Sequence, residues 1–121
     1  MAQIFRDNVV VITGASAGIG RELAVQLAAQ GAWLSLAARN LEMLDAAAAD
    51  CRTRGARALA VQTDVADQAQ CRNLVERTVA EYGRIDTLVN NAGIGMWARF
   101  DELADPALLA SLMQVNYMGS V

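Results

Sequence analysis

The chain has 121 residues, the usual length of a single domain with one hydrophobic core. Its 13 acidic and 10 basic residues give a net charge of −3, so no basic surface is expected for a nucleic-acid backbone, and nucleic acid is excluded as a partner. Every basic residue is an arginine. Because lysine and histidine are absent, two common proton carriers of active sites are missing.

The first predicted elements are a strand and a helix joined by glycines. Residues 8–13, NVVVIT, form a short apolar run rich in β-branched side chains, which is typical of a strand buried on both faces. After the glycines, Ile19, Leu23 and Leu27 recur at helical spacing, and Gly31 follows as a stop signal. The spacing predicts a helix that packs these three side chains against the sheet.

The same alternation then repeats. Residues 33–38, WLSLAA, predict a second strand. Asn40 is a favourable N-cap for a helix that ends at Gly55. Residues 58–62, ALAVQ, predict a third strand.

A third helix and a fourth strand complete the pattern. Asp67, with Gln70 three residues on, predicts a capping box at the start of a helix that Gly83 ends. Residues 85–89 predict the fourth strand, and Pro106 suits the first turn of a last helix that reaches Asn116. The side chains expected on the buried face of the third helix are Cys71, Leu74, Val75, Thr78 and Tyr82.

Strands and helices therefore alternate four times with short connections. Such alternation is typical of parallel strands joined by right-handed helical crossovers. The predicted fold class is α/β, a Rossmann-type doubly wound parallel sheet truncated to about four strands, with helices on both faces. No linker or repeat divides the chain, so residues 1–121 are predicted to form one domain.

The glycines between the first strand and the first helix carry the main functional signal. In the run Thr13 to Gly20, TGASAGIG, Gly14 permits a tight turn, Gly18 allows the backbone to approach a pyrophosphate, and Gly20 allows close packing of helix on strand. The helix that follows directs its free N–H groups and positive dipole end at the phosphates. The single domain is therefore predicted to bind a dinucleotide.

The spacing Gly-x-x-x-Gly-x-Gly resembles the cofactor loop of the short-chain dehydrogenase/reductase family, in its compact branch. Asp64-Val65, after the third strand, resembles the family's adenine-contacting pair. Residues 90–93, NNAG, resemble its structural and ribose-side motif, and Asn116 lies where the family keeps the asparagine of its catalytic tetrad. These matches, in order, cover nearly the whole chain.

The resemblance implies the strand order 3-2-1-4 and hydride transfer between a nicotinamide cofactor and a small-molecule carbonyl or alcohol substrate. It also implies a homo-oligomer, because the region from Pro106 to Asn116 is used for subunit contacts in the family. By this resemblance Asn116 is a catalytic residue. The cofactor-binding residues that it implies are Thr13, Gly14, Ser16, Gly18, Ile19, Gly20, Asp64, Val65, Asn90, Ala92 and Gly93.

Each match outside the loop has a second interpretation. Asp64 is also a residue type that shapes a turn before a helix, and Asn90 and Asn91 are types that tolerate left-handed turn conformations. Asn116 is equally consistent with an exposed helix position. Met96 and Trp97 would line a substrate mouth or simply pack at the carboxyl end of the fourth strand.

The end of the second strand indicates which cofactor is preferred. NAD-binding folds usually place an acidic residue there for the ribose 2′-hydroxyl, whereas this chain has Ala38 followed by Arg39. A guanidinium suits the 2′-phosphate of NADP, so Arg39 is a cofactor-binding candidate and NADP is predicted over NAD. Ala17 argues the other way, because many NADP-dependent relatives carry a second basic residue there. A solvated surface arginine is the alternative for Arg39.

The proton-transfer machinery of the family is not found in these residues. The family's reaction uses a serine and a Tyr-x-x-x-Lys pair, whereas Tyr82 is followed by Asp86 and Tyr117 by Val121. The chain is therefore expected to be the N-terminal portion of a longer enzyme, inactive alone. The alternative is a non-catalytic nucleotide-binding module or remnant. A flavodoxin-like FMN domain is disfavoured by the glycine spacing.

The absence of a fifth strand would leave Leu88 and Val89 on an open edge, which predicts that the chain self-associates. No apolar run approaches the roughly 20 residues of a membrane span, and no signal peptide is recognised. Cys51 and Cys71 are expected to be buried apolar residues rather than metal ligands, so no metal is predicted. A cytoplasmic location is expected.

Overall fold

The computed structural model describes residues 5–91 and 113–115 of the chain. All its strands are parallel and form one sheet in the order β3-β2-β1-β4-β5, so the predicted order 3-2-1-4 is confirmed and a fifth strand is added. The elements, in chain order, are β1 (Val9–Thr13), α1 (Gly18–Ala29), β2 (Trp33–Ala38), α2 (Leu41–Thr53), β3 (Arg57–Gln62), α3 (Gln68–Tyr82), β4 (Thr87–Val89) and β5 (Met113–Val115).

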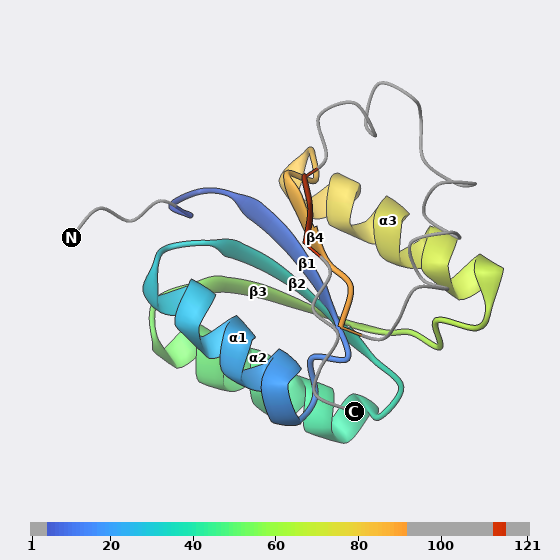
Figure 1. The fold of residues 1–121 in the computed structure, drawn as a ribbon, viewed down its shortest axis with the longest axis horizontal. Helices are drawn as coiled ribbons and strands as arrows, with labels where there is room; N and C mark the ends of the chain where they lie inside the picture. The colour runs from blue at the N-terminus through green and yellow to red at the C-terminus, as the bar shows by residue number, and fades with distance from the viewer. Residues whose placement is uncertain (1–4, 92–112, 116–121) are drawn as a thin grey trace.

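The sheet is covered on both faces. Helices α1 and α2 lie on one face and α3 lies on the other (Figure 1). Successive side chains of β1 alternate between the two cores, with Val10 and Ile12 packed on the α1–α2 side and Val11 on the α3 side. Every residue of β1 is buried, as the apolar run of the sequence predicts for the central strand of a parallel sheet.

The predicted buried face is confirmed for α3 and wrong in part for α1. The buried residues of α3 are the five predicted ones. In α1, however, Ile19 is 37% exposed, while the small residues Gly20, Ala24 and Ala28 are buried beside Leu27. The reason is that the start of α1 approaches the loop after β1 very closely at Gly20, so the helix turns a face of mostly small residues to the sheet.

The helix caps are also confirmed in part. The Asn40 side chain accepts a hydrogen bond from the Met43 N–H group at 3.0 Å and begins α2 as predicted. The Asp67 carboxylate accepts from two N–H groups of the first turn of α3. Gln70 does not return to the Asp67 N–H group as a capping box requires, because its Oε1 accepts from the Asp64 N–H group at 2.8 Å instead.

The last predicted helix is wrong over residues 113–115, which form β5. This strand pairs with β4 in the register Thr87↔Met113 through Val89↔Val115. The edge of β4 presents unpaired backbone groups, and a strand satisfies them where a helix does not. The edge of β4, which the sequence predicts to be open, is therefore paired with β5. An open β4 edge is no longer a reason to expect self-association. Residues 106–112 and Asn116 lie outside the described residues.

Candidate cofactor site

The loop between β1 and α1 is built around a very close backbone approach. A Cβ atom added at Gly20 would lie 2.2 Å from the Gly14 carbonyl oxygen and 2.7 Å from Nδ2 of Asn91. That Asn91 amide donates a hydrogen bond to the same Gly14 oxygen at 3.2 Å. Only glycine fits at position 20. Asn91, which lies just after β4, holds the loop after β1 through its hydrogen bond to Gly14.

The first turn of α1 is open to a ligand. Its N-cap is Ala17, which has no side chain that can accept a hydrogen bond, and the first turn contains no acidic residue. Gly18 has a φ of +59°, and a Cβ atom there would meet nothing within 4 Å. Free N–H groups at a helix N-terminus with open space before them are suited to an anion such as a pyrophosphate.

A cavity of about 530 Å³ lies at the carboxyl ends of β1, β2 and β3. It brings together five of the residues that the sequence singles out, Gly14, Ser16, Arg39, Asp64 and Val65. Its other lining residues are Ala38, Asn40, Thr63 and Ala66. Sequence reasoning did not assign Asn40, Thr63 or Ala66 to the site, although each follows the end of a strand, which is where ligands of parallel sheets bind.

Other residues that the sequence proposed for cofactor binding do not line this cavity. Thr13 is buried in β1, with Oγ1 3.5 Å from the Val89 carbonyl oxygen. Ile19 lines a separate depression on α1 with Glu22. Ala92, Gly93 and Asn116 lie outside the described residues, as do Met96 and Trp97.

Asn90 is buried without hydrogen-bond partners in the part of the chain that the structure describes. It is 1% exposed, and neither its Nδ2 nor its Oδ1 has a partner there. A buried amide in this state is costly, by about 1–3 kcal/mol for each unpaired group. Asn90 therefore remains a position where a polar partner is needed.

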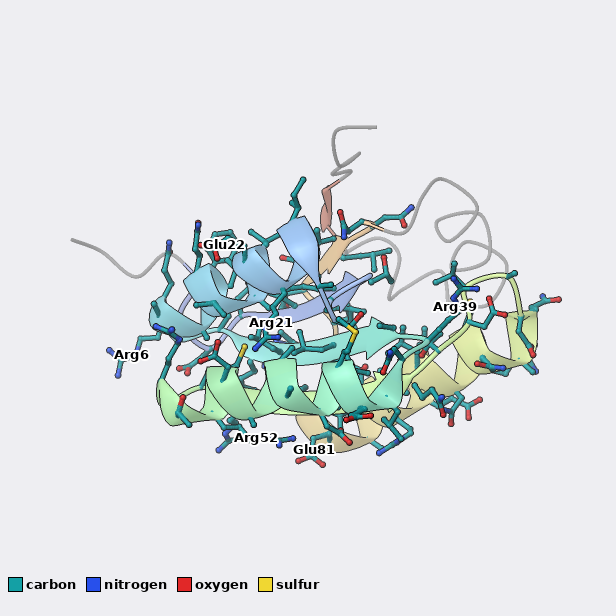
Figure 2. All side chains as sticks on the ribbon, turned by 90° about the horizontal axis from the view of Figure 1, so that it is seen from below. Arg6, Arg21, Glu22, Arg39, Arg52 and Glu81 are labelled. Atoms are coloured by element: carbon teal, nitrogen blue, oxygen red, sulfur yellow. The ribbon has the colours of Figure 1, made fainter. Side chains whose placement is uncertain are left out.

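One positively charged side chain, Arg39, and one negatively charged side chain, Asp64, line the cavity. Arg39 is exposed, and among the described residues its guanidinium group makes no ion pair or hydrogen bond. Figure 2 shows it beyond the end of β2, at the opposite end of the sheet from Arg6. The Asp64 carboxylate accepts a hydrogen bond from the Ala66 N–H group at 2.9 Å, so it shapes the turn and lines the cavity at once. The Asp64 carboxylate is thus held by the backbone, whereas the Arg39 guanidinium remains available to a ligand.

The glycine loop, the strand order and the cavity at the carboxyl edge are the parts of a dinucleotide-binding fold. A family model described as short chain dehydrogenase matches residues 8–121. The chain belongs to this family.

Three similar proteins each match most of the length of this chain. An 11-beta-hydroxysteroid dehydrogenase of Pinus massoniana is 41% identical over 115 residues, which are 94% of this chain and 32% of the pine protein. The crystal structure of levodione reductase is 33% identical, with a TM-score of 0.82 over 93% of this chain and 54% of that one. NAD+-bound xylitol dehydrogenase is 35% identical, with a TM-score of 0.72 over 75% of this chain and 35% of its own. The chain thus spans only part of each relative.

The tyrosine that the structure describes is not placed as a short-chain dehydrogenase needs its catalytic tyrosine. Tyr82 ends α3, and its hydroxyl donates to the Leu34 carbonyl oxygen at 2.8 Å in the interior. Burial, with a smaller contribution from the charge of Glu81, raises the pKa of Tyr82 to about 12. Because its buried hydroxyl is bound to the backbone of β2, Tyr82 is a structural residue.

The two cysteines are buried as predicted, and neither lines the cavity. Burial, together with the charge of Asp50, raises the pKa of the Cys51 thiol, which makes it less reactive. Within residues 5–91, no group of three or more His, Cys, Asp or Glu side chains could hold a metal ion. No helix in that range is long and apolar enough to cross a membrane.

Proposed function

We propose that this chain is the NADP(H)-binding portion of a short-chain dehydrogenase/reductase that interconverts a small-molecule carbonyl compound and its alcohol. The observation that carries the proposal is the cavity that joins the glycine loop to Arg39 and to Asp64-Val65. When bound, the nicotinamide cofactor supplies or accepts the hydride. The residues of this chain bind and orient it.

The described residues fit such a cofactor. The uncapped first turn of α1 and the open space at Gly18 suit the pyrophosphate. Arg39 offers an unpaired guanidinium group to an additional phosphate, and Ala38 places no carboxylate in its way. These two residues favour NADP over NAD for this chain, although the relative xylitol dehydrogenase was solved with NAD+.

A second candidate is a nucleotide-binding module without catalysis. The 121 residues contain no lysine, so they contain no Tyr-x-x-x-Lys pair to transfer the proton. Arginine does not replace that lysine, because it stays protonated and cannot take part in a proton relay. This candidate predicts cofactor binding without turnover.

The proposal is tested by titrating the purified chain with NADPH and NADH, using calorimetry, and comparing Arg39→Ala with Arg6→Ala as a control. A charged hydrogen bond contributes about 1.5–3 kcal/mol, so Arg39→Ala should weaken NADPH binding by about 10- to 100-fold and leave NADH binding unchanged. Arg6→Ala should change neither. An unchanged NADPH/NADH ratio in Arg39→Ala would refute the cofactor preference, and no binding of either nucleotide would refute the proposal.

Turnover tests whether these residues carry out the reaction by themselves. The oxidation of NADPH is followed by its absorbance in the presence of a panel of ketones and aldehydes. Oxidation by the chain would support an enzyme complete in these residues and contradict the non-catalytic module. Binding without oxidation supports a chain that holds the cofactor but lacks the proton-transfer pair.

A further inference from the structure

The side chain of Gln62 links β2 and β3 at the point where the two strands separate. The backbone ladder between the two strands ends with the pair Ala38↔Gln62, after which the Thr63 N–H group donates to the Ala38 carbonyl oxygen at 2.9 Å. The next carbonyl oxygen, that of Arg39, has no backbone partner in the ladder. Nε2 of Gln62 donates to it at 3.0 Å and so adds one rung to the sheet.

This hydrogen bond lies next to the cofactor cavity, because Arg39 also lines that cavity. A second depression, of about 410 Å³, is lined by Arg39, Gln62, Asp64 and Gln70. It shares Arg39 and Asp64 with the cofactor cavity. Among its lining residues, Oε1 of Gln70 accepts from the Asp64 N–H group at 2.8 Å. Two glutamine side chains therefore hold the two loops that form the walls of the site.

We propose that Gln62 is a positioning residue that sets the preference for NADP(H) over NAD(H) by fixing the Arg39 peptide. The inference rests on the proposed function, because it concerns the same cavity. The backbone is held at two successive residues. Gln62 donates to the Arg39 carbonyl oxygen, and the next residue, Asn40, caps α2. The Arg39 guanidinium group has no partner among the described residues, so the peptide is the part of Arg39 that the surrounding structure holds.

The expected effect is selective. Only NADP carries the 2′-phosphate, so only NADP binding gains from an Arg39 whose peptide is already ordered. Without the Gln62 hydrogen bond, the peptide must be ordered when the phosphate binds, and that cost reduces the affinity. For NADH, the glycine loop and Asp64 are the same with or without the Gln62 hydrogen bond. A general loosening of the fold, by contrast, would weaken both nucleotides equally.

The test measures dissociation constants for NADPH and NADH with wild type, Gln62→Met, Arg39→Ala and the double variant. Methionine has nearly the shape of glutamine but no donor. Gln26→Met is the matched control, because Gln26 is an exposed glutamine of α1 that donates to Glu22 away from the cavity. Urea denaturation of each variant verifies that it folds.

Loss of one net hydrogen bond predicts that Gln62→Met weakens NADPH binding about fivefold and leaves NADH binding unchanged. In the Arg39→Ala background the same substitution should not alter the NADPH/NADH ratio, since there is no charge left to position. Equal weakening of both nucleotides, no change at all, or an effect that persists without Arg39 would overturn the inference. If wild type does not prefer NADPH, or Arg39→Ala keeps the preference, the cofactor assignment of the proposed function fails as well. If both behave as expected and Gln62→Met is neutral, only the role of Gln62 fails.

Discussion

Gly20→Ala is the sharpest test of the loop geometry, because two effects of opposite sign compete. Alanine in place of glycine within a helix stabilises it by about 0.5–1 kcal/mol. Here, however, the new methyl group would lie 2.2 Å from the Gly14 carbonyl oxygen, which is backbone and cannot rotate away. Overpacking of this kind costs about 1–3 kcal/mol. Displacement of the Asn91 amide removes a hydrogen bond that contributes about 1 kcal/mol more.

The clash therefore outweighs the helix propensity, and the variant should lose about 2 kcal/mol of unfolding free energy. For a chain of 121 residues this corresponds to a fall in Tm of about 8 °C. Circular dichroism during thermal and urea denaturation measures both quantities, and NADPH affinity should fall because the loop is displaced.

Gly55→Ala is the control for Gly20→Ala. Gly55 has a φ of +90°, and a Cβ atom there would meet nothing within 4 Å. Its substitution should cost about 1–2 kcal/mol through the left-handed backbone alone and leave NADPH affinity unchanged. A Gly20→Ala variant as stable as wild type would show that α1 moves away freely, and the reasoning from close approach would be wrong.

Two further predictions concern stability. Because unfolded Tyr82 ionises near pH 10 and folded Tyr82 keeps its proton to about pH 12, wild type should lose up to about 3 kcal/mol as pH rises through this window. Tyr82→Phe should cost about 1 kcal/mol at pH 7 and show a shallower alkaline decline in urea denaturation, and an equally steep decline would contradict the assigned pKa. Asp67→Ala removes the acceptor for the Ala69 and Gln70 N–H groups, so urea denaturation should show a loss of about 1–2 kcal/mol. An unchanged midpoint would mean that this cap adds nothing.

The fold was predictable where large side chains marked the contact. The buried face of α3 followed from its spacing, because Leu74, Val75 and Tyr82 are large enough to show the period. The face of α1 was less predictable, because three of its four buried residues, Gly20, Ala24 and Ala28, carry little hydrophobic signal. Closeness of approach is a tertiary property that hydrophobic periodicity does not encode.

Residues 113–115 were missed for a related reason. Their local sequence is compatible with a helix, and the pairing with β4 depends on an edge that exists only once the sheet is assembled.

The candidate site was predictable at its glycine loop and less so around it. Gly14 and Ser16 lie in the cavity because the loop is continuous in sequence and its shape is local. Gln62 gave no signal, since a glutamine at the end of a strand is an ordinary exposed residue until its partner in the neighbouring loop is known. The sequence predicts Gln70 as a capping residue, and its Nε2 does donate to the Asp67 carboxylate, but its Oε1 accepts from the Asp64 N–H group, which lies outside the helix that the motif describes.

The hydrogen bond between Asn91 and Gly14 also has a consequence for protein synthesis. The two residues are 77 positions apart, so at about 5–20 residues per second a ribosome releases the loop some 4–15 s before it adds the side chain that fastens it. Throughout that interval the glycine loop of the growing chain lacks the hydrogen bond from Asn91. A ligand of the cavity therefore meets a fully fastened loop, and can stabilise it by mass action, only after Asn91 has been added.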